Sequence, residues 1–60
     1  IARKVQEEAE ELTRAARDES DQRVVEEAAD LLYHTWVLLV ERGVELGSVR
    51  QELERRRHGR

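Results

Sequence analysis

Residues 24–40, VVEEAADLLYHTWVLLV, decide the fold because they combine helical spacing with too many apolar side chains for one neighbouring helix to cover. At about 100° per residue, the apolar positions of this stretch spread over an arc of roughly 220° around a helix. An apolar face of that width is typical of a helix at the centre of a bundle. The remaining strip of this helix is polar and carries Arg23, Glu27, Asp30, His34 and Glu41.

The rest of the chain also favours helix. Alanine, leucine, glutamate and arginine dominate, and no stretch shows the alternation of apolar and polar residues that strands require. We expect a first helix that ends at about Arg17, a second that ends just before Gly43, and a third over roughly residues 46–56. Ser20 or Asp21 can cap the second helix. The chain is therefore predicted to be a single all-α domain over its whole length.

Chain length and the wide apolar face together predict assembly. With 60 residues, the chain forms one small domain, and at this size a lone chain hides only about 60% of its unfolded surface. Two further helices cannot surround the second one. We therefore expect a homodimer that pairs the second helices near Leu32, Trp36 and Leu39. The chain also opens without a helix cap, so we expect a further N-terminal helical segment in the full-length protein.

Charge and composition exclude several classes of protein. Charged residues make up 42% of the chain and the formal net charge is -3, a balance that does not favour nucleic acid or an anionic membrane. The sequence has no cysteine, no apolar run that can span a bilayer and no signal-peptide pattern. We therefore expect a cytoplasmic protein without nucleic-acid or membrane partners. The basic run RRRHGR, residues 55–60, is typical of a solvated helix end.

The acidic run in KVQEEAEEL, residues 4–12, does not point in one direction. At about 100° per residue, Glu8 projects from the same arc as the apolar residues of this helix, while Lys4 and Glu11 lie on the flank and Glu7 is intermediate. A carboxylate on a core face is costly unless a cation compensates it. The apolar residues of this expected core face are Ile1, Val5, Ala9, Leu12 and Ala16.

Two acidic pairs share the i, i+3 spacing that places both carboxylates on one helix face: Glu8 with Glu11, and Glu27 with Asp30. Carboxylates that project from facing helices suit Mg²⁺ or Mn²⁺, and the histidine or cysteine sets of zinc sites are missing. Most acidic runs are nevertheless solvated surfaces, and Lys4 can serve simply as a helical partner of Glu8. The residues alone leave two interpretations open, a metal site or a non-catalytic helical dimerisation module.

A longer pattern adds to these interpretations. The order E-E-x-x-E at residues 7–11, followed after fifteen residues by E-x-x-D at residues 27–30, resembles the signature of the all-α nucleotide pyrophosphatase superfamily, the MazG-like enzymes. Within it, the stretches KVQEEAEEL, EEAADLLYH, VLLVERGVELGSV and ELERRRH resemble the phosphoribosyl-ATP pyrophosphatase family. The tyrosine-histidine pair after E-x-x-D and the R-G turn distinguish this family from its dCTP- and MazG-type relatives.

The resemblance implies a helical bundle completed by dimerisation. It also implies hydrolysis of 1-(5-phosphoribosyl)-ATP to 1-(5-phosphoribosyl)-AMP and pyrophosphate, the second step of histidine biosynthesis. Glu7 or Glu8 would be the catalytic residue that orients or deprotonates water, and Lys4 and His34 would bind the substrate. The implied ligands of Mg²⁺, or of Mn²⁺, are Glu8, Glu11, Glu27 and Asp30.

The resemblance also sets limits. Members of the family are longer, and they occur fused behind a phosphoribosyl-AMP cyclohydrolase domain. Gln6 stands where many relatives have a small residue, a variation that we expect to be tolerated. A house-cleaning pyrophosphatase that acts on non-standard deoxynucleoside triphosphates stays an alternative activity, which substrate profiling distinguishes.

Overall fold

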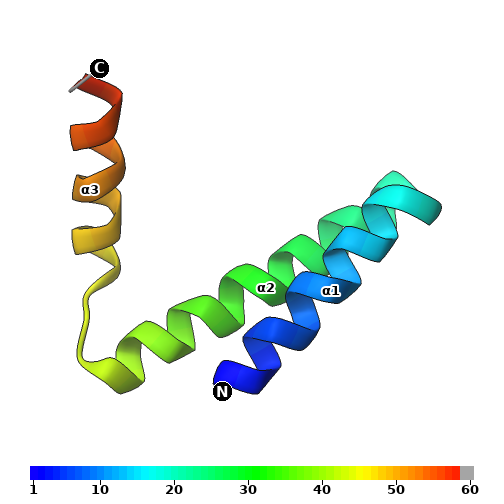
Figure 1. The fold of residues 1–60 in the computed structure, drawn as a ribbon, viewed down its shortest axis with the longest axis horizontal. Helices are drawn as coiled ribbons and strands as arrows, with labels where there is room; N and C mark the ends of the chain where they lie inside the picture. The colour runs from blue at the N-terminus through cyan, green and yellow to red at the C-terminus, as the bar shows by residue number, and fades with distance from the viewer. Residues whose placement is uncertain (59–60) are drawn as a thin grey trace.

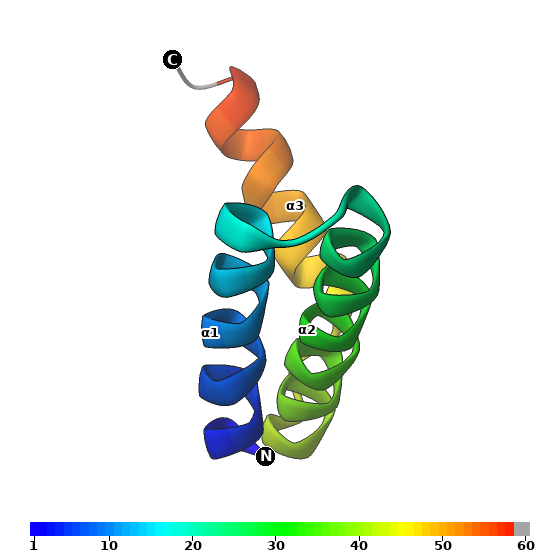
Figure 2. The ribbon, with the colours of Figure 1, turned by 90° about the vertical axis from the view of Figure 1, so that its right-hand side faces the viewer.

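A computed structural model describes residues 1–58, and all of their regular secondary structure is helical. The helices are α1 (Ala2–Asp18), α2 (Asp21–Arg42) and α3 (Leu46–His58). Helices α1 and α2 form an antiparallel hairpin, while α3 turns away from it and packs little on either helix (Figures 1 and 2). The predicted all-α class is confirmed. Gly59 and Arg60, the last residues of the expected solvated end, lie outside the described residues.

Side-chain and backbone caps fix both ends of α2. The Ser20 hydroxyl accepts a hydrogen bond from the backbone N–H of Arg23 at 3.3 Å, so Ser20 is the N-cap rather than Asp21. Gly43 has a left-handed conformation, with φ 78°, that suits glycine because it has no Cβ. The N–H of Val44 also donates to the carbonyl of Leu39 at 2.9 Å, which completes a Schellman motif. The chain therefore turns sharply into α3.

Helix α3 continues to His58, past the expected end near residue 56. Ion pairs at helical spacing explain the extension: Arg55 and Arg56 both contact Glu52, and His58 lies 3.4 Å from Glu54. Basic side chains in the last turn also interact favourably with the negative end of the helix dipole. The boundary of α1 differs less, since it ends at Asp18 rather than Arg17.

The contact between α1 and α2 is unusually polar. Ala15 is the one fully buried apolar residue among those described, and the only other buried residues are Glu8 and Glu27, which are 5% and 6% exposed. The prediction that Glu8 lies on the core face of α1 is confirmed. Two carboxylates thus occupy positions where a helical hairpin ordinarily places leucine or valine.

The predicted core face was wrong at its edges. Ala16 is exposed and Ile1 is 44% exposed, while Val5, Ala9 and Leu12 are half-buried. Because α2 packs over the side of α1 that presents Glu8 and Ala15, the buried arc is rotated away from Ala16. The small side chain of Ala15 is fully buried at this point of the contact.

Helices α2 and α3 carry a broad exposed apolar surface. None of the large apolar side chains in the described part of the chain is fully buried. The wide apolar face predicted for α2 is therefore only partly covered by the other helices of the same chain. The exposed large apolar residues from α2 onward are Val25, Leu32, Tyr33, Trp36, Val40, Val44, Leu46, Val49 and Leu53.

Over residues 1–58, no helix combines the length and the apolar character that crossing a bilayer requires.

Candidate metal centre

Three carboxylates from two helices converge where α1 meets α2. Glu8 and Glu11 come from neighbouring turns of α1, and Glu27 comes from α2. One carboxylate oxygen of each residue lies within 4.8 Å of the others. We call these residues the three-carboxylate cluster. The spacing predicted that Glu8 and Glu11 share a face, and the antiparallel hairpin brings that face to Glu27.

Each buried glutamate of the cluster has one paired oxygen and one unpaired oxygen. Glu8 Oε1 lies 3.6 Å from Lys4 Nζ, and Glu27 Oε2 accepts a hydrogen bond of 2.5 Å from Arg23 Nη2. Glu8 Oε2 and Glu27 Oε1 are buried and have no hydrogen-bond partner. A buried acceptor without a partner is costly, and more so when it is charged. The two unpaired oxygens therefore identify a position that suits a cation.

The electrostatics of the cluster are reflected in the pKa of Glu27. Burial raises this pKa above its ordinary value, and the neighbouring charge of Glu11 raises it further. Arg23 acts in the opposite direction, and the charge of Asp30 adds a smaller increase. Burial and the neighbouring negative charges thus both oppose the ionisation of Glu27.

Asp30 and Glu7 lie outside the cluster. Asp30 is exposed, and the convergent group of carboxylates contains Glu8, Glu11 and Glu27 without it. Its charge nevertheless raises the pKa of Glu27, so it faces the same region. Glu7 is exposed and is not a member of the group. Three of the four predicted metal ligands thus converge, and Asp30 does not.

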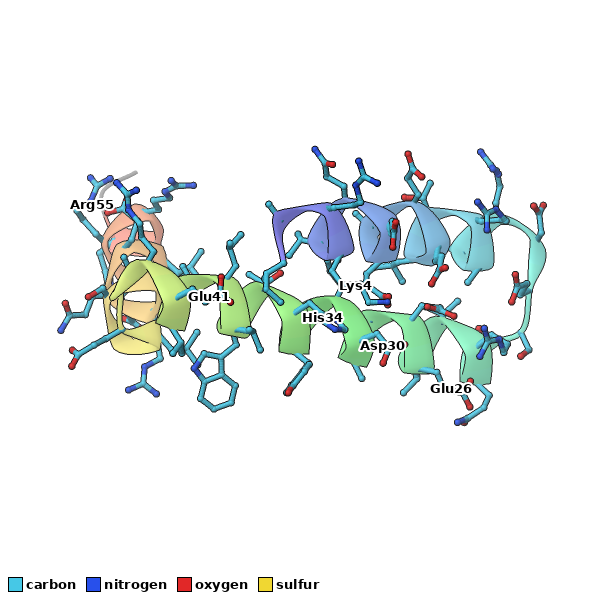
Figure 3. The ribbon with its side chains drawn as sticks, turned by 90° about the horizontal axis from the view of Figure 1, so that it is seen from below. Lys4, Glu26, Asp30, His34, Glu41 and Arg55 are labelled. Carbon is cyan, nitrogen blue, oxygen red and sulfur yellow. The ribbon has the colours of Figure 1, made fainter. Side chains whose placement is uncertain are left out.

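Of the two residues predicted to bind substrate, Lys4 contacts the cluster through Glu8, and His34 contacts the backbone of Asp30 on α2. Figure 3 shows Lys4 reaching from α1 toward α2, which carries Asp30 and His34. His34 Nδ1 lies 2.9 Å from the backbone oxygen of Asp30. Because a carbonyl oxygen only accepts, Nδ1 carries the proton, and Nε2 of the neutral ring is left as an acceptor. The edge of the Tyr33 ring contacts His34, with ring centroids 5.2 Å apart.

Arg23 was expected only to lie on the polar strip of the second helix, without a role in the site. The structure shows its guanidinium in contact with Glu19, Glu26 and Glu27. One signal was present in the sequence, because Arg23 precedes Glu27 by one helical turn, the same spacing that separates Lys4 from Glu8.

The cluster fits a hard divalent cation. Its donors are all carboxylate oxygens, as Mg²⁺ and Mn²⁺ prefer, and two of those oxygens are buried and unpaired. An ordinary solvated acidic surface has no such oxygens, because water satisfies them. The fold and the site together define an all-α protein with a carboxylate site of the kind that binds such a cation.

Comparison with known proteins identifies the family. Residues 1–57 match the family described as phosphoribosyl-ATP pyrophosphohydrolase. The chain therefore belongs to this family, which has the all-α MazG-like fold. The resemblance inferred from the motifs is confirmed.

Individual relatives carry consistent names. A phosphoribosyl-ATP pyrophosphatase of Pyrobaculum aerophilum is 62% identical over 56 residues, which are 93% of this chain and 60% of the relative. The enzyme of the same name from Lactiplantibacillus plantarum is 50% identical, over 93% of this chain and 53% of its own length. A histidine biosynthesis bifunctional protein HisIE of Wolinella succinogenes is 50% identical over 93% of this chain and 24% of its own.

The chain spans about 60% of the length of the Pyrobaculum relative. No solved structure matches it.

Proposed function

We propose that the full-length protein hydrolyses 1-(5-phosphoribosyl)-ATP to 1-(5-phosphoribosyl)-AMP and pyrophosphate in the cytoplasm, as a step of histidine biosynthesis. Family membership and the names of the relatives support the substrate. The observation that carries the proposal is the pair of unpaired, buried carboxylate oxygens on facing helices, Glu8 Oε2 and Glu27 Oε1. A protein whose charges served only solubility would not maintain them.

Glu8, Glu11 and Glu27 would hold the divalent cation, with Asp30 as a further ligand at the edge of the cluster. Bound there, Mg²⁺ or Mn²⁺ would offset the charge of a triphosphate and stabilise the charge that develops in the transition state. The cluster by itself repels a triphosphate. The cation is therefore a condition for substrate binding as well as for reaction.

Lys4 would bind a phosphate group of the substrate. Its side chain is 51% exposed, and a single contact of 3.6 Å ties its ammonium group to Glu8. An ammonium group is a compact charge on a flexible stem, so Lys4 can turn from Glu8 to an incoming phosphate oxygen. Because Glu8 is buried, the cost of that movement would be offset by the cation that then neutralises its carboxylate.

Glu8 or Glu7 would orient or deprotonate the attacking water. Glu8 has a buried, unpaired oxygen, Oε2, which would accept a proton from water if the cation does not fully occupy it. Glu7 is exposed and has the freedom to act from the solvent side. His34 would act through Nε2, because its Nδ1 is engaged by the backbone oxygen of Asp30. When the ring is protonated, Nε2–H would donate to a phosphate oxygen or to a ligand carboxylate.

We also propose a homodimer in which the second helices pair. The exposed apolar face of α2, with Leu32, Tyr33 and Trp36 all more than half exposed, supports this assembly. Large apolar surfaces of this kind mark interaction sites.

The test is a pyrophosphate-release assay on the full-length protein with phosphoribosyl-ATP, with and without Mg²⁺ or Mn²⁺. We expect release only when the cation is present, and none after chelation. Deoxynucleoside triphosphates serve as the competing substrates. A larger kcat/KM for non-standard deoxynucleoside triphosphates would favour the house-cleaning activity, and no release from any substrate would contradict the enzymatic proposal.

A further inference from the structure

Arg23 forms ion pairs with three glutamates at once. Its Nε lies 3.2 Å from Glu19 Oε1, its Nη2 lies 2.5 Å from Glu27 Oε2, and its Nη1 contacts Glu26. Its backbone is fixed as well, because its N–H donates to the Ser20 cap. Both the main chain and the guanidinium of Arg23 are thus held in place.

Fold stability alone explains these contacts poorly. Arg23 lies in the first turn of α2, where the helix dipole disfavours a positive charge. Its side chain is 49% exposed, and ion pairs of that exposure contribute little to stability. The contact with Glu27 differs from the others because Glu27 is buried. Arg23 occupies one oxygen of Glu27 and leaves the other buried without a partner.

Helix α1 repeats this arrangement. Lys4 stands one turn before Glu8 and pairs with one of its oxygens, while the second oxygen of Glu8 is buried and unpaired. The two pairs differ in rigidity. Lys4 has a single contact, whereas three carboxylates and a planar fork of donors hold Arg23. Lys4 is therefore free to leave its glutamate, and Arg23 is fixed to its own.

We propose that Arg23 is a positioning residue: by holding Glu27 Oε2, it fixes the orientation in which the other oxygen of Glu27 can join Glu8 and Glu11 in binding a divalent cation. This inference rests on the proposed function, because it assigns the oriented oxygen to the cation. Arg23 itself touches neither the cation nor the substrate.

The test measures Mn²⁺ binding to the metal-free full-length protein, by electron paramagnetic resonance of the free ion, for the wild type and for Arg23→Gln and Arg23→Lys. Loss of an oriented outer partner weakens metal binding by about tenfold or more. Loss of a positive charge alone would instead strengthen cation binding. Weaker Mn²⁺ binding by Arg23→Gln therefore indicates lost positioning rather than lost charge. Arg23→Lys keeps the positive charge but not the planar guanidinium, and we expect it to weaken Mn²⁺ binding as well.

Arg55→Gln is the matched control. Arg55 also donates from Nε and Nη2 to a carboxylate, that of Glu52, but it lies on α3. If Arg23 had only a structural role, Arg23→Gln would behave as Arg55→Gln does. Its melting temperature would fall, and its Mn²⁺ affinity would stay unchanged. Circular dichroism verifies that each variant keeps its helices, and Arg23→Lys provides the answer if Arg23→Gln does not fold.

The outcomes separate two failures. If the wild type binds Mn²⁺ and releases pyrophosphate, and both Arg23 variants bind Mn²⁺ as tightly as the wild type or more tightly, this inference is wrong and the proposed function stands. If the wild type binds no Mn²⁺, the proposed metal site is wrong, and the role of Arg23 falls with it.

Discussion

Glu8 and Glu27 converge from facing helices, and each of them leaves one buried oxygen without a hydrogen-bond partner. Each also has its other oxygen paired with a basic residue one turn earlier in its own helix. In each of these glutamates, one carboxylate oxygen is therefore paired with a basic side chain and the other is not. A buried, charged oxygen without a partner lowers the stability of the metal-free protein, and the proposed metal site accounts for this cost.

The first prediction concerns Glu8→Gln. We expect this change to lower pyrophosphate release at least a hundredfold, because it removes a charged ligand from the cluster. The metal-free protein should become more stable, with a melting temperature higher by about 5 °C, because the repulsion of Glu8 with Glu11 and Glu27 is lost. Glu10→Gln, at an exposed position of α1, should change neither quantity. A fully active Glu8→Gln would contradict the assigned role.

The second prediction concerns the metal. A cation that binds the native state alone stabilises it by RT ln(1 + [L]/Kd), about 2.7 kcal/mol when the free metal is a hundred times Kd. We expect Mg²⁺ to raise the melting temperature of the full-length protein above that in NaCl of equal ionic strength. In Glu27→Gln the increase should be much smaller. An equal increase in the wild type and the variant would show that Mg²⁺ acts elsewhere.

The third prediction is a pair of opposite pH dependences in the metal-free protein. Burial raises the pKa of Glu27 above its ordinary value of 4.5. The native state therefore binds a proton at Glu27 more readily than the unfolded state does. The stability that this proton contributes is lost as pH rises from 4.5 through the raised pKa. The stability of Glu27→Gln relative to wild type should therefore increase with pH over that window.

Glu26 provides the contrast at the adjacent position. Hydrogen bonds from Gln22 and then Arg23 lower its pKa, so its contribution is present above 4.5 and is lost as pH falls through the lowered pKa. The penalty of Glu26→Gln should therefore disappear in acid. Thermal melts from pH 3 to pH 8 measure both trends, and parallel curves for the two variants would refute the assignment.

The fourth prediction concerns assembly. Sedimentation of the full-length protein at low micromolar concentration should show a dimer, and Trp36→Glu should dissociate it, because a carboxylate in an apolar interface is costly to desolvate. Arg14→Glu, at an exposed position of α1, should leave the dimer intact. A wild-type monomer with full helical signal would contradict the homodimer.

The fifth prediction uses two glycines at which an added Cβ would meet no other atom within 4 Å. Gly43→Ala should destabilise the full-length protein by about 1 kcal/mol, because an L residue is strained at its positive φ. Gly47→Ala should instead stabilise by about 0.5 kcal/mol, since Gly47 lies in α3 and alanine favours helix. Urea unfolding measures both changes. Equal effects would show that space rather than backbone conformation governs these positions.

Much of the site followed from helical angles alone. The burial of Glu8 and the shared face of Glu8 and Glu11 depend only on position along one helix, which the sequence specifies. Ala16 was predicted to lie on the core face, but Ala15 is buried instead, because the rotation of α1 against α2 decides which of them is covered. That rotation depends on side-chain packing, which angular spacing does not describe.

The contacts of Arg23 could not be predicted for a different reason. Three glutamates, Glu19, Glu26 and Glu27, lie at helical spacing from it, and spacing does not decide which of them the side chain reaches. Asp30 shows the same limit. Its i, i+3 relation to Glu27 places it on the right side of α2, but how far that side faces α1 depends on tertiary structure.

The position of the single tryptophan has a spectroscopic consequence. Trp36 follows Glu27 by nine residues, which is about half a turn beyond two full turns, so the two side chains point to opposite sides of α2. Trp36 is 52% exposed and lies beside Tyr33 and Val40 along a shallow apolar depression. Its fluorescence emission therefore reports what covers the outer face of α2, shifting to shorter wavelength when that face becomes dry, and is insensitive to events among the carboxylates.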